Sequence, residues 1–419
     1  MQEQLDPHQA DHLFLLIGGN PVPNAVAALT LVKEHGQITF LHTKETKPVA
    51  DRLTDWLSRK RSDSIRTNSM QIHISDPQDI YNSIKKCAEE HLEVGQTVGL
   101  HYTGGTKSMA VHAHHAISDL AAGKHVFSYL DARTLRMVFD PSDVTLYGGR
   151  ESVYMGIEPR FELDDLIKIN GWTYPKRGAP EESAHLLPVA KALGKLNANH
   201  PEQRKALKAW LRWHKDQVGE NTKSEKQVEL PEDPLLKDVR QALTGTLNNV
   251  IQENQFRVAD ASKAAGFSSV KDFSFWFAGG WLEHLTLHAL ETTPRLEFHR
   301  CVRNFTLTPT PNPANQANPK FEFDVVGIRG HQLFAFSCTT SNKKKECKMK
   351  LFELYTRARQ FGGDEARIAL VCTVDQPARL HAEMKQRLGT DKVAVFGRQH
   401  IDGLAANLSP WIEDQIGQP

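Results

Sequence analysis

The sequence has little of what marks disulfide-rich, zinc-binding or membrane proteins. Its 419 residues include only five cysteines, no two of which form a Cys-x-x-Cys pair, so neither a disulfide framework nor a structural zinc site is expected. No apolar run approaches the ~20 residues of a membrane span, and residues 1–11 lack the charged-then-apolar pattern of a signal peptide. We therefore expect a cytoplasmic protein that has no membrane partner.

The chain also lacks a net charge of either sign. Its 51 Lys and Arg residues against 50 Asp and Glu residues leave a formal charge of +1. The whole molecule therefore has no electrostatic footprint for nucleic acid, and such binding would need local basic patches. Hydrophobic residues at 40% and charged residues at 24% are typical of a globular protein. A chain of this length exceeds one ordinary hydrophobic core, which predicts two or three domains.

Strands and helices alternate along the N-terminal part of the chain. This pattern predicts a parallel sheet with helices on both faces, and in such sheets ligands bind beyond the carboxyl ends of the strands. Two Gly-rich turns, Gly18-Gly19-Asn20 and Thr103-Gly104-Gly105-Thr106, follow strands and are expected at that edge. The predicted strands are His12–Ile17, Ile38–His42, Ile72–Ile74, Thr97–His101 and Val126–Leu130, with helices over 24–33, 50–57, 80–91 and 107–121.

The middle of the chain is more charged and predominantly helical. The segment Asp260–Phe267 could form the turn of a helix-turn-helix of winged-helix type, although a simple packing helix is the commoner meaning of such a pattern. Trp210 and Trp213 lie among basic residues and could stack on single-stranded bases. Their spacing fits one helical face, which favours packing against a neighbouring domain.

The alternation returns near Trp276. Helices are predicted over 281–290 and 346–361, strands over 297–307, 321–328, 333–337 and 369–372, and a polar loop over 311–319. We therefore divide the chain into an α/β domain at 1–150, a linker and helical region at 151–274, and a second α/β domain at 275–419.

The segment Thr103–Ser108 carries the clearest chemistry. Its glycines allow backbone amides to approach a phosphate, and the helix that follows offers free N–H groups and a partial positive charge. Lys107 adds a charge, and Thr106 and Ser108 add hydroxyl donors. Thr106 stands where a P-loop needs the glycine before its lysine, so this pattern favours phosphate recognition over nucleotide hydrolysis. The alternative is a tight strand-to-helix turn with a capping hydroxyl.

Two segments resemble the CARF sensor domain of CRISPR accessory proteins: Gly18–Asn24 and Leu100–Ala110. Three later segments resemble the restriction-endonuclease-like, PD-(D/E)xK domain that is fused to CARF in the CRISPR ancillary nuclease family: Gly279–Glu283, Phe323–Val326 and Ser337–Thr340. The resemblance implies a Rossmann-like parallel sheet for the first domain. It also implies a homodimer that binds a cyclic oligoadenylate, with cyclic tetra-adenylate as the expected ring. The ligand-binding residues that it implies are Gly19, Asn20, Pro21, Asn24, Thr43, Thr103, Gly104, Gly105, Thr106, Lys107 and Ser108.

The catalytic motif of the second domain departs from the family pattern. Restriction-type nucleases use a helical Glu, a strand Asp and then Glu-x-Lys on the next strand, and these carboxylates hold metals that activate water. Glu283 and Asp324 match the first two positions, but Ser337-Cys338-Thr339 occupies the place of Glu-x-Lys. In one interpretation the missing functions have moved to the following helix, and the catalytic residues are Glu283, Asp324, Ser337, Thr339, Lys350 and Glu353. In the other, the domain is degenerate and only binds nucleic acid or a partner.

The first interpretation predicts a ligand-activated, metal-dependent endonuclease of type III CRISPR defence. Asp324, Glu283 and Glu353 would hold Mg²⁺ or Mn²⁺, because hard oxygen ligands suit these ions. DNA is the preferred substrate, cut or nicked, and RNA remains open. The alternative function is a non-catalytic sensor that binds nucleic acid through a degenerate nuclease fold or a helix-turn-helix.

Overall fold

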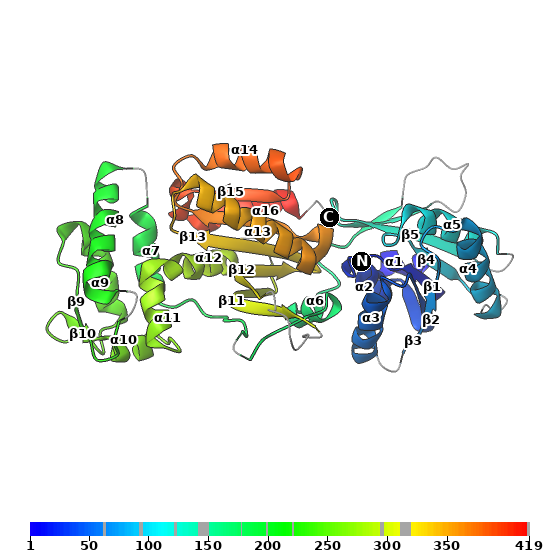
Figure 1. The fold of residues 1–419 in the computed structure, drawn as a ribbon, viewed down its shortest axis with the longest axis horizontal. Helices are drawn as coiled ribbons and strands as arrows, with labels where there is room; N and C mark the ends of the chain where they lie inside the picture. The colour runs from blue at the N-terminus through cyan, green and yellow to red at the C-terminus, as the bar shows by residue number, and fades with distance from the viewer. Residues whose placement is uncertain are drawn as a thin grey trace.

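The computed structural model of the chain describes all residues except 62–63, 92–94, 121–123, 141–150, 177, 198–199, 220–221, 294–296, 311–319 and 417–419. The predicted polar loop at 311–319 therefore lies outside the described residues. Three units follow one another along the long axis of the molecule: an N-terminal α/β domain, a central α/β domain and a small helical lobe (Figure 1). In the part of the chain that is described, no helix combines the length and apolarity that crossing a membrane would need.

The N-terminal domain is built on a seven-stranded sheet of order β3-β2-β1-β4-β5-β6-β7. The first five strands in this order are parallel, and β6 and β7 extend the sheet in antiparallel fashion. The strands are β1 (Ala10–Leu16), β2 (Val32–His42), β3 (Arg66–Gln71), β4 (Val98–His101), β5 (His125–Asp131), β6 (Arg136–Phe139) and β7 (Ser152–Tyr154).

Alternate side chains of β1 face opposite layers of helices. Leu13 and Leu15 pack in one cluster with α2 (Val22–Thr30) and α3 (Lys47–Lys60). Phe14 and Leu16 pack in another with α4 (Pro77–His91) and α5 (Lys107–Ser118). A short helix, α1 (Gln2–Leu5), precedes β1. The predicted sheet with helices on both faces is confirmed.

One predicted strand is misplaced. The strand expected at Ile72–Ile74 is β3, which spans Arg66–Gln71 and ends before Ile72. This strand lies at the edge of the sheet, and all but two of its residues are exposed. Its sequence is therefore polar, so the search for an apolar run found the residues that follow it. Ile72 is buried, whereas Ile74 is exposed.

The central domain holds a six-stranded mixed sheet of order β15-β14-β13-β12-β11-β8. Its strands are β8 (Trp172–Thr173), β11 (Arg300–Pro309), β12 (Phe321–Arg329), β13 (Gln332–Thr339), β14 (Arg367–Cys372) and β15 (Val393–Phe396). The helices around it are α6 (Leu163–Ile169), α12 (Trp281–Thr292), α13 (Lys344–Gly362), α14 (Pro377–Leu388), α15 (Arg398–Ile401) and α16 (Leu404–Gln415). The mixed α/β class is confirmed, and α14, β15, α15 and α16 extend the fold beyond the last predicted strand.

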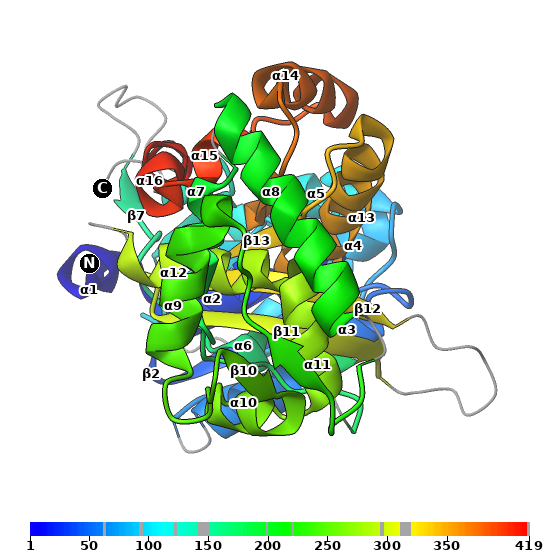
Figure 2. The same ribbon diagram turned by 90° about the vertical axis from the view of Figure 1, so that its left-hand side faces the viewer.

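The helical lobe packs against one end of the central sheet. In Figure 2 this lobe faces the viewer. Trp210 is fully buried and stacks on Phe277 with ring centroids 5.7 Å apart, which confirms packing as its role. Gly266, at φ 81°, forms the turn between α10 and α11, and α11 continues through a wide turn at Trp276–Gly280 into α12. The elements of the lobe are α7 (Leu187–Lys195), α8 (Pro201–Trp213), β9 (Gln227–Glu229), α9 (Lys237–Thr246), β10 (Gln255–Arg257), α10 (Val258–Ala264) and α11 (Val270–Phe275).

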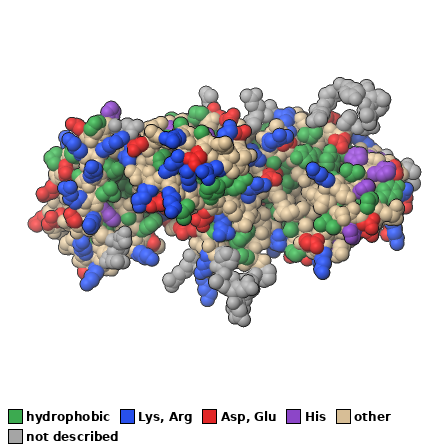
Figure 3. Space-filling model, turned by 45° about the horizontal axis from the view of Figure 1, so that its top comes forward, with side chains coloured by type: hydrophobic (Ala, Val, Ile, Leu, Met, Phe, Trp, Pro, Cys, Tyr) green, Lys and Arg blue, Asp and Glu red, His purple; other side chains and the backbone are tan. Residues whose placement is uncertain are grey.

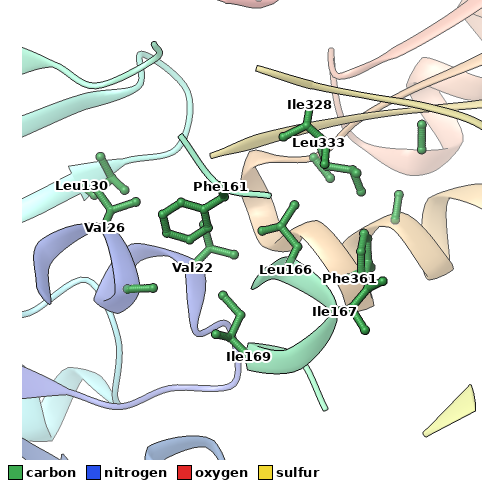
Figure 4. Close-up of a cluster of buried hydrophobic side chains, with 14 of the residues drawn as sticks. Val22, Val26, Leu130, Phe161, Leu166, Ile167, Ile169, Ile328, Leu333 and Phe361 are labelled. Atoms are coloured by element: carbon green, nitrogen blue, oxygen red, sulfur yellow. The ribbon is translucent and has the colours of Figure 1, made fainter. Parts of the chain in front are cut away.

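A continuous hydrophobic core joins the N-terminal domain to the central domain. Val22 and Val26 of α2 and Leu130 of β5 belong to the same buried cluster as Leu333 and Phe361 of the central domain. Phe161 and helix α6 fill the space between the two sheets (Figure 4). Burial of this apolar surface favours one fixed arrangement of the two domains within a chain.

Candidate functional site

The two Gly-rich turns of the N-terminal domain lie in contact. Strands β1 and β4 are parallel neighbours, so the turns that follow them meet at the carboxyl edge of the sheet. A methyl group on Gly18 would lie 3.0 Å from the amide nitrogen of Gly105. The Cβ of a residue at 104 would collide with the carbonyl oxygen of Leu16 and lie 2.9 Å from the nitrogen of Gly18. Glycine is therefore required at position 104 for the two turns to approach each other.

The hydroxyl groups of the second turn support its backbone. Thr103 accepts a hydrogen bond from the amide of Leu130 at 2.7 Å, and Thr106 caps α5 by accepting from the amide of Met109 at 3.2 Å. Thr106 and Ser108 also donate to the carbonyls of Ile74 and Ser75. These contacts match the capping interpretation and leave the hydroxyls available to a ligand only in part.

Other groups at this edge are open to solvent. Gly19, Gly105 and Lys107 are exposed, and no hydrogen bond or ion pair to the Lys107 ammonium occurs in the part of the chain that is described. The N-terminus of α5 begins at Lys107. Backbone N–H groups, a helix N-terminus and a free cation therefore converge beside two glycines, which is the chemistry that binds phosphate.

The remaining residues expected to bind ligand lie behind or beside this surface. Asn24 is fully buried and donates to the carbonyl of Leu16 at 3.0 Å, and Pro21 is buried at the start of α2. Thr43 follows β2 and donates to Glu45 at 2.8 Å. Asn20 donates to Glu365 of the central domain at 2.9 Å.

A second polar cluster lies in the central domain, where β12, β13, α12 and α13 meet. Asp324 accepts hydrogen bonds from the Ser337 hydroxyl at 2.9 Å and from the Cys338 amide at 2.7 Å. Lys350 of α13 approaches the same carboxylate oxygen, Oδ2, to 3.7 Å. The other oxygen, Oδ1, has no hydrogen-bond partner among the described residues. The helical spacing of Lys350 and Glu353 predicted that both could point at Asp324; Lys350 approaches it, whereas Glu353 is exposed.

Glu283 is the second carboxylate of this cluster. Burial, followed by the nearby negative charge of Asp324, raises the pKa of its carboxyl group to about 8. Arg303 of β11 opposes this shift, with 3.9 Å between its guanidinium and Glu283. Arg303 is itself buried and also pairs with Glu181. Two carboxylates that repel each other in a partly buried site favour a bound cation.

Two predicted residues lie apart from these contacts. Glu353 is exposed on α13, and Thr339 accepts a hydrogen bond from the amide of Ser341 at 3.2 Å. No group of three His, Cys, Asp or Glu side chains that could hold a metal ion occurs among the described residues. The cluster thus brings together Glu283, Asp324, Ser337 and Lys350.

Sequence reasoning missed Arg303 and Glu383. Arg303 lies on a strand beside Glu283, and its only signal is a charged residue within an apolar stretch. Glu383 of α14 pairs with Lys344 and Lys348 of α13 and with Arg387. The hydrogen bonds from Lys344 and Lys348 lower the pKa of its carboxyl group to about 2. The pairs Glu283–Arg303, Glu383–Lys344 and Glu383–Lys348 could not be found from local spacing because they join different elements, whereas Arg387 lies four residues after Glu383 on α14.

The raised pKa of Glu283 makes stability depend on pH. Between its usual value of 4.5 and about 8, the folded protein keeps a proton that the unfolded chain releases, so stability falls as pH rises through this window. In metal-free buffer we expect Glu283→Gln to raise the free energy of unfolding by about 1–3 kcal/mol near pH 8.5 and to change it little near pH 5. Urea unfolding at both pH values measures this, with exposed Glu353→Gln as the control. An unchanged pH profile would contradict the prediction.

Comparison with known proteins identifies the fold. No protein-family model matches the sequence, and no curated protein matches it. Among solved structures, protein VC1899 from Vibrio cholerae matches with a TM-score of 0.69 and 16% identity over 98% of this chain and 100% of that one. Can2 from Sulfobacillus thermosulfidooxidans, in complex with cyclic tetra-adenylate, matches with a TM-score of 0.65 and 15% identity over 98% and 99%. Over almost its whole length this chain therefore has the fold of VC1899 and Can2, in agreement with the resemblance to CARF nucleases.

Proposed function

We propose that this protein is a metal-dependent endonuclease of type III CRISPR defence that cyclic tetra-adenylate activates. The observation that carries the proposal is the pair of touching Gly-rich turns, with exposed Lys107 beside them, on a chain that shares its fold with Can2 in complex with cyclic tetra-adenylate. Backbone amides and the lysine would bind the phosphates of the ring. A two-fold symmetric ring suits a homodimer in which each copy contributes both turns.

The donor set of the Asp324 cluster fits a divalent cation. Asp324 Oδ1 and the Glu283 carboxylate are hard oxygen donors, and Mg²⁺ is commonly held by one or two protein carboxylates together with substrate phosphates. Burial and then the negative charge of Asp324 raise the pKa of Glu283, and a cation held by the two carboxylates would offset this effect. Asp324 and Glu283 would therefore hold Mg²⁺ or Mn²⁺, which activates water and stabilises charge at phosphorus when bound.

The protein's own groups have distinct roles in this proposal. Ser337 and the Cys338 amide hold Asp324 by one oxygen, which fixes the direction of the other. Lys350 supplies the positive charge that the lysine of Glu-x-Lys provides in the family pattern, beside the phosphate to be cleaved.

DNA is the proposed substrate. The test is cleavage of plasmid DNA, single-stranded DNA and RNA with Mn²⁺ or Mg²⁺, in the presence and absence of cyclic tetra-adenylate. Failure of cleavage in every combination would contradict the nuclease proposal.

One observation favours the non-catalytic alternative. No group of three His, Cys, Asp or Glu side chains that could hold a metal ion occurs among the described residues, although Glu322 of β12 interacts electrostatically with Asp324, and Lys350 already offsets part of the Asp324 charge. A degenerate domain of this kind would bind nucleic acid without cutting it. Binding of DNA that depends on the ring, with intact product under every metal, would identify this function.

The basic face of α13 and α14 is the proposed nucleic-acid surface. Lys and Arg side chains gather around acidic ones on the face that Figure 3 presents. Lys344 and Lys348 are paired with Glu383, whereas exposed Lys345 has no ion pair within the described ranges. Lys345 lies about one and a half turns of α13 before Lys350, and we propose that it contacts a phosphate beyond the one being cleaved.

Lys345→Glu is therefore expected to weaken DNA binding about three- to tenfold and to reduce the slope of log K against log salt by about one. Fluorescence anisotropy over a salt series measures both quantities, in an Asp324→Asn background that prevents cleavage. Lys86→Glu on α4 of the N-terminal domain changes the net charge equally and is expected to leave binding unchanged. Equal losses in the two variants would argue against a localised surface.

A further inference from the structure

Asn20 belongs to the ligand-facing turn but is bonded to the central domain. Its side-chain oxygen accepts from the amide of Val22 at 3.1 Å, and its nitrogen donates to Glu365 Oε2 at 2.9 Å. Glu365 is 1% exposed, and burial raises the pKa of its carboxyl group. Its other oxygen, Oε1, has no hydrogen-bond partner among the described residues. Asn20 is therefore the donor on which this buried carboxylate depends.

The backbone around Glu365 is shaped to receive Asn20. Gly363 adopts φ 64°, and a Cβ at this position would collide with the side chain of Asn20. The turn Gly363–Glu365 follows directly on the last residue of α13, Gly362. The close approach of Asn20 to Gly363 and its hydrogen bond to Glu365 join the Gly18–Asn20 turn (the sensor turn) to the C-terminal end of this helix.

Helix α13 connects that end with the catalytic cluster. Its buried residues Leu351, Leu354, Ala358 and Phe361 pack in the core shared by the two domains. Lys350 lies on the same helix, twelve residues before Gly362, and contacts Asp324 of β12. A helix moves as a rigid rod about 18 Å long over this distance, so displacement of its C-terminal end also moves Lys350.

We propose that the hydrogen bond between Asn20 and Glu365 is a latch that holds α13 in its resting position, and that the bound ring opens it by taking the Asn20 amide. This proposal rests on the proposed function and specifies how binding of its ligand changes the position of α13. The amide lies between exposed Gly19 and buried Pro21, at the surface where phosphates are expected. Once the amide turns to the ligand, Glu365 loses its only side-chain donor among the described residues.

The loss of this donor drives the change. An unpaired carboxylate is costly in a buried site, so the Gly363–Glu365 turn must shift to give Glu365 another partner or water. The ring then binds the shifted arrangement more tightly than the resting one, which is the condition for activation. By reciprocity, weakening the latch must tighten ring binding.

The test removes the acceptor. Glu365→Leu is expected to bind cyclic tetra-adenylate about tenfold more tightly than wild type and to raise ring-free DNA cleavage towards the activated rate. Glu365→Gln keeps an acceptor oxygen and is expected to stay within about threefold of wild type in both measurements. Isothermal titration calorimetry gives the affinity, and plasmid nicking gives the rate.

Asn170→Ala is the matched control. Asn170 donates to the carbonyl of Phe361 at 2.8 Å, so its removal also breaks a hydrogen bond to the end of α13, but from α6 and not from the sensor turn. We expect wild-type ring affinity and wild-type ring-free cleavage for this variant. Equal effects of Asn170→Ala and Glu365→Leu would overturn the latch, because general loosening of α13 would explain both.

The outcomes separate this proposal from the proposed function. Wild-type protein that does not bind the ring contradicts the proposed function itself. Wild-type protein that binds and responds to the ring, together with a Glu365→Leu variant of unchanged affinity and ring-free rate, contradicts the latch alone. If Glu365→Leu does not fold, Asn20→Asp places a carboxylate against Glu365, and the latch predicts higher ring-free cleavage there as well. An unchanged rate in that variant would also overturn it.

Discussion

Replacement of Asp324 by alanine is expected to lower the rate of nucleic-acid cleavage by about a hundredfold or more while the affinity for cyclic tetra-adenylate stays the same. The reason is local. Asp324 lies where the hydroxyl of Ser337, the amide of Cys338 and the ammonium of Lys350 converge, and its remaining oxygen is the best-placed metal ligand of the cluster. The proposed ring site lies in the N-terminal domain, so ring affinity is not expected to depend on Asp324.

Asp324→Asn separates charge from shape. The amide oxygen can still accept from Ser337 and the Cys338 amide, so the fold is retained, but the ligand is neutral and binds Mg²⁺ poorly. We expect a loss of cleavage close to that of Asp324→Ala, with wild-type thermal stability to within about 1 kcal/mol. Plasmid nicking under saturating ring measures the rate. Wild-type nicking by Asp324→Asn would show that the cutting site lies elsewhere.

Glu353 distinguishes two versions of this site. The migrated-motif hypothesis uses Glu353 as a third metal ligand, yet its side chain is exposed and joins no metal-binding group within the described residues. We therefore expect Glu353→Ala to retain most of the cleavage rate. A loss as large as that of Asp324→Ala would instead mean that Glu353 turns inward when metal and substrate bind.

The parts of this structure that could be predicted from sequence are those that local patterning encodes. Alternating strands and helices predicted the parallel sheet, and the sheet predicted that turns after β1 and β4 would lie at one edge. Gly18 and Gly105 are indeed in contact. The helical spacing after β13 predicted that Lys350 and Glu353 could point together at Asp324, and of the two only Lys350 approaches it among the described residues. In each case a residue's place follows from the period of its own element.

Other features depend on contacts that no local period encodes. Asn20 and Glu365 are separated by 345 positions, and Arg303 reaches Glu283 only because β11 pairs beside β12 next to α12. The polar edge strand β3 was misplaced for a related reason. Its burial depends on its position in the sheet rather than on its own sequence. Such contacts become visible only when the order of strands and the packing of domains are known.

Gly104→Ala is expected to abolish ring binding, with a loss of affinity of about thirtyfold or more, and with it the ring-dependent part of DNA cleavage. The added methyl group would collide with the carbonyl of Leu16 and crowd the amide of Gly18. Both neighbours are backbone atoms, so the two turns must move apart. Calorimetry with cyclic tetra-adenylate measures the loss, and we expect the free energy of unfolding to fall by about 1–3 kcal/mol.

Gly245→Ala provides the matched control for this substitution. Gly245 lies in helix α9, and a methyl group there meets nothing within 4 Å, so alanine is expected to leave ring binding unchanged and to stabilise the helix by about 0.5–1 kcal/mol. The Gly104 and Asp324 variants then form a reciprocal pair. One should lose ring binding but keep the low ring-free rate, and the other should keep ring binding but lose cleavage. Normal ring affinity in Gly104→Ala would show that the ligand does not use these turns, whatever the catalytic cluster does.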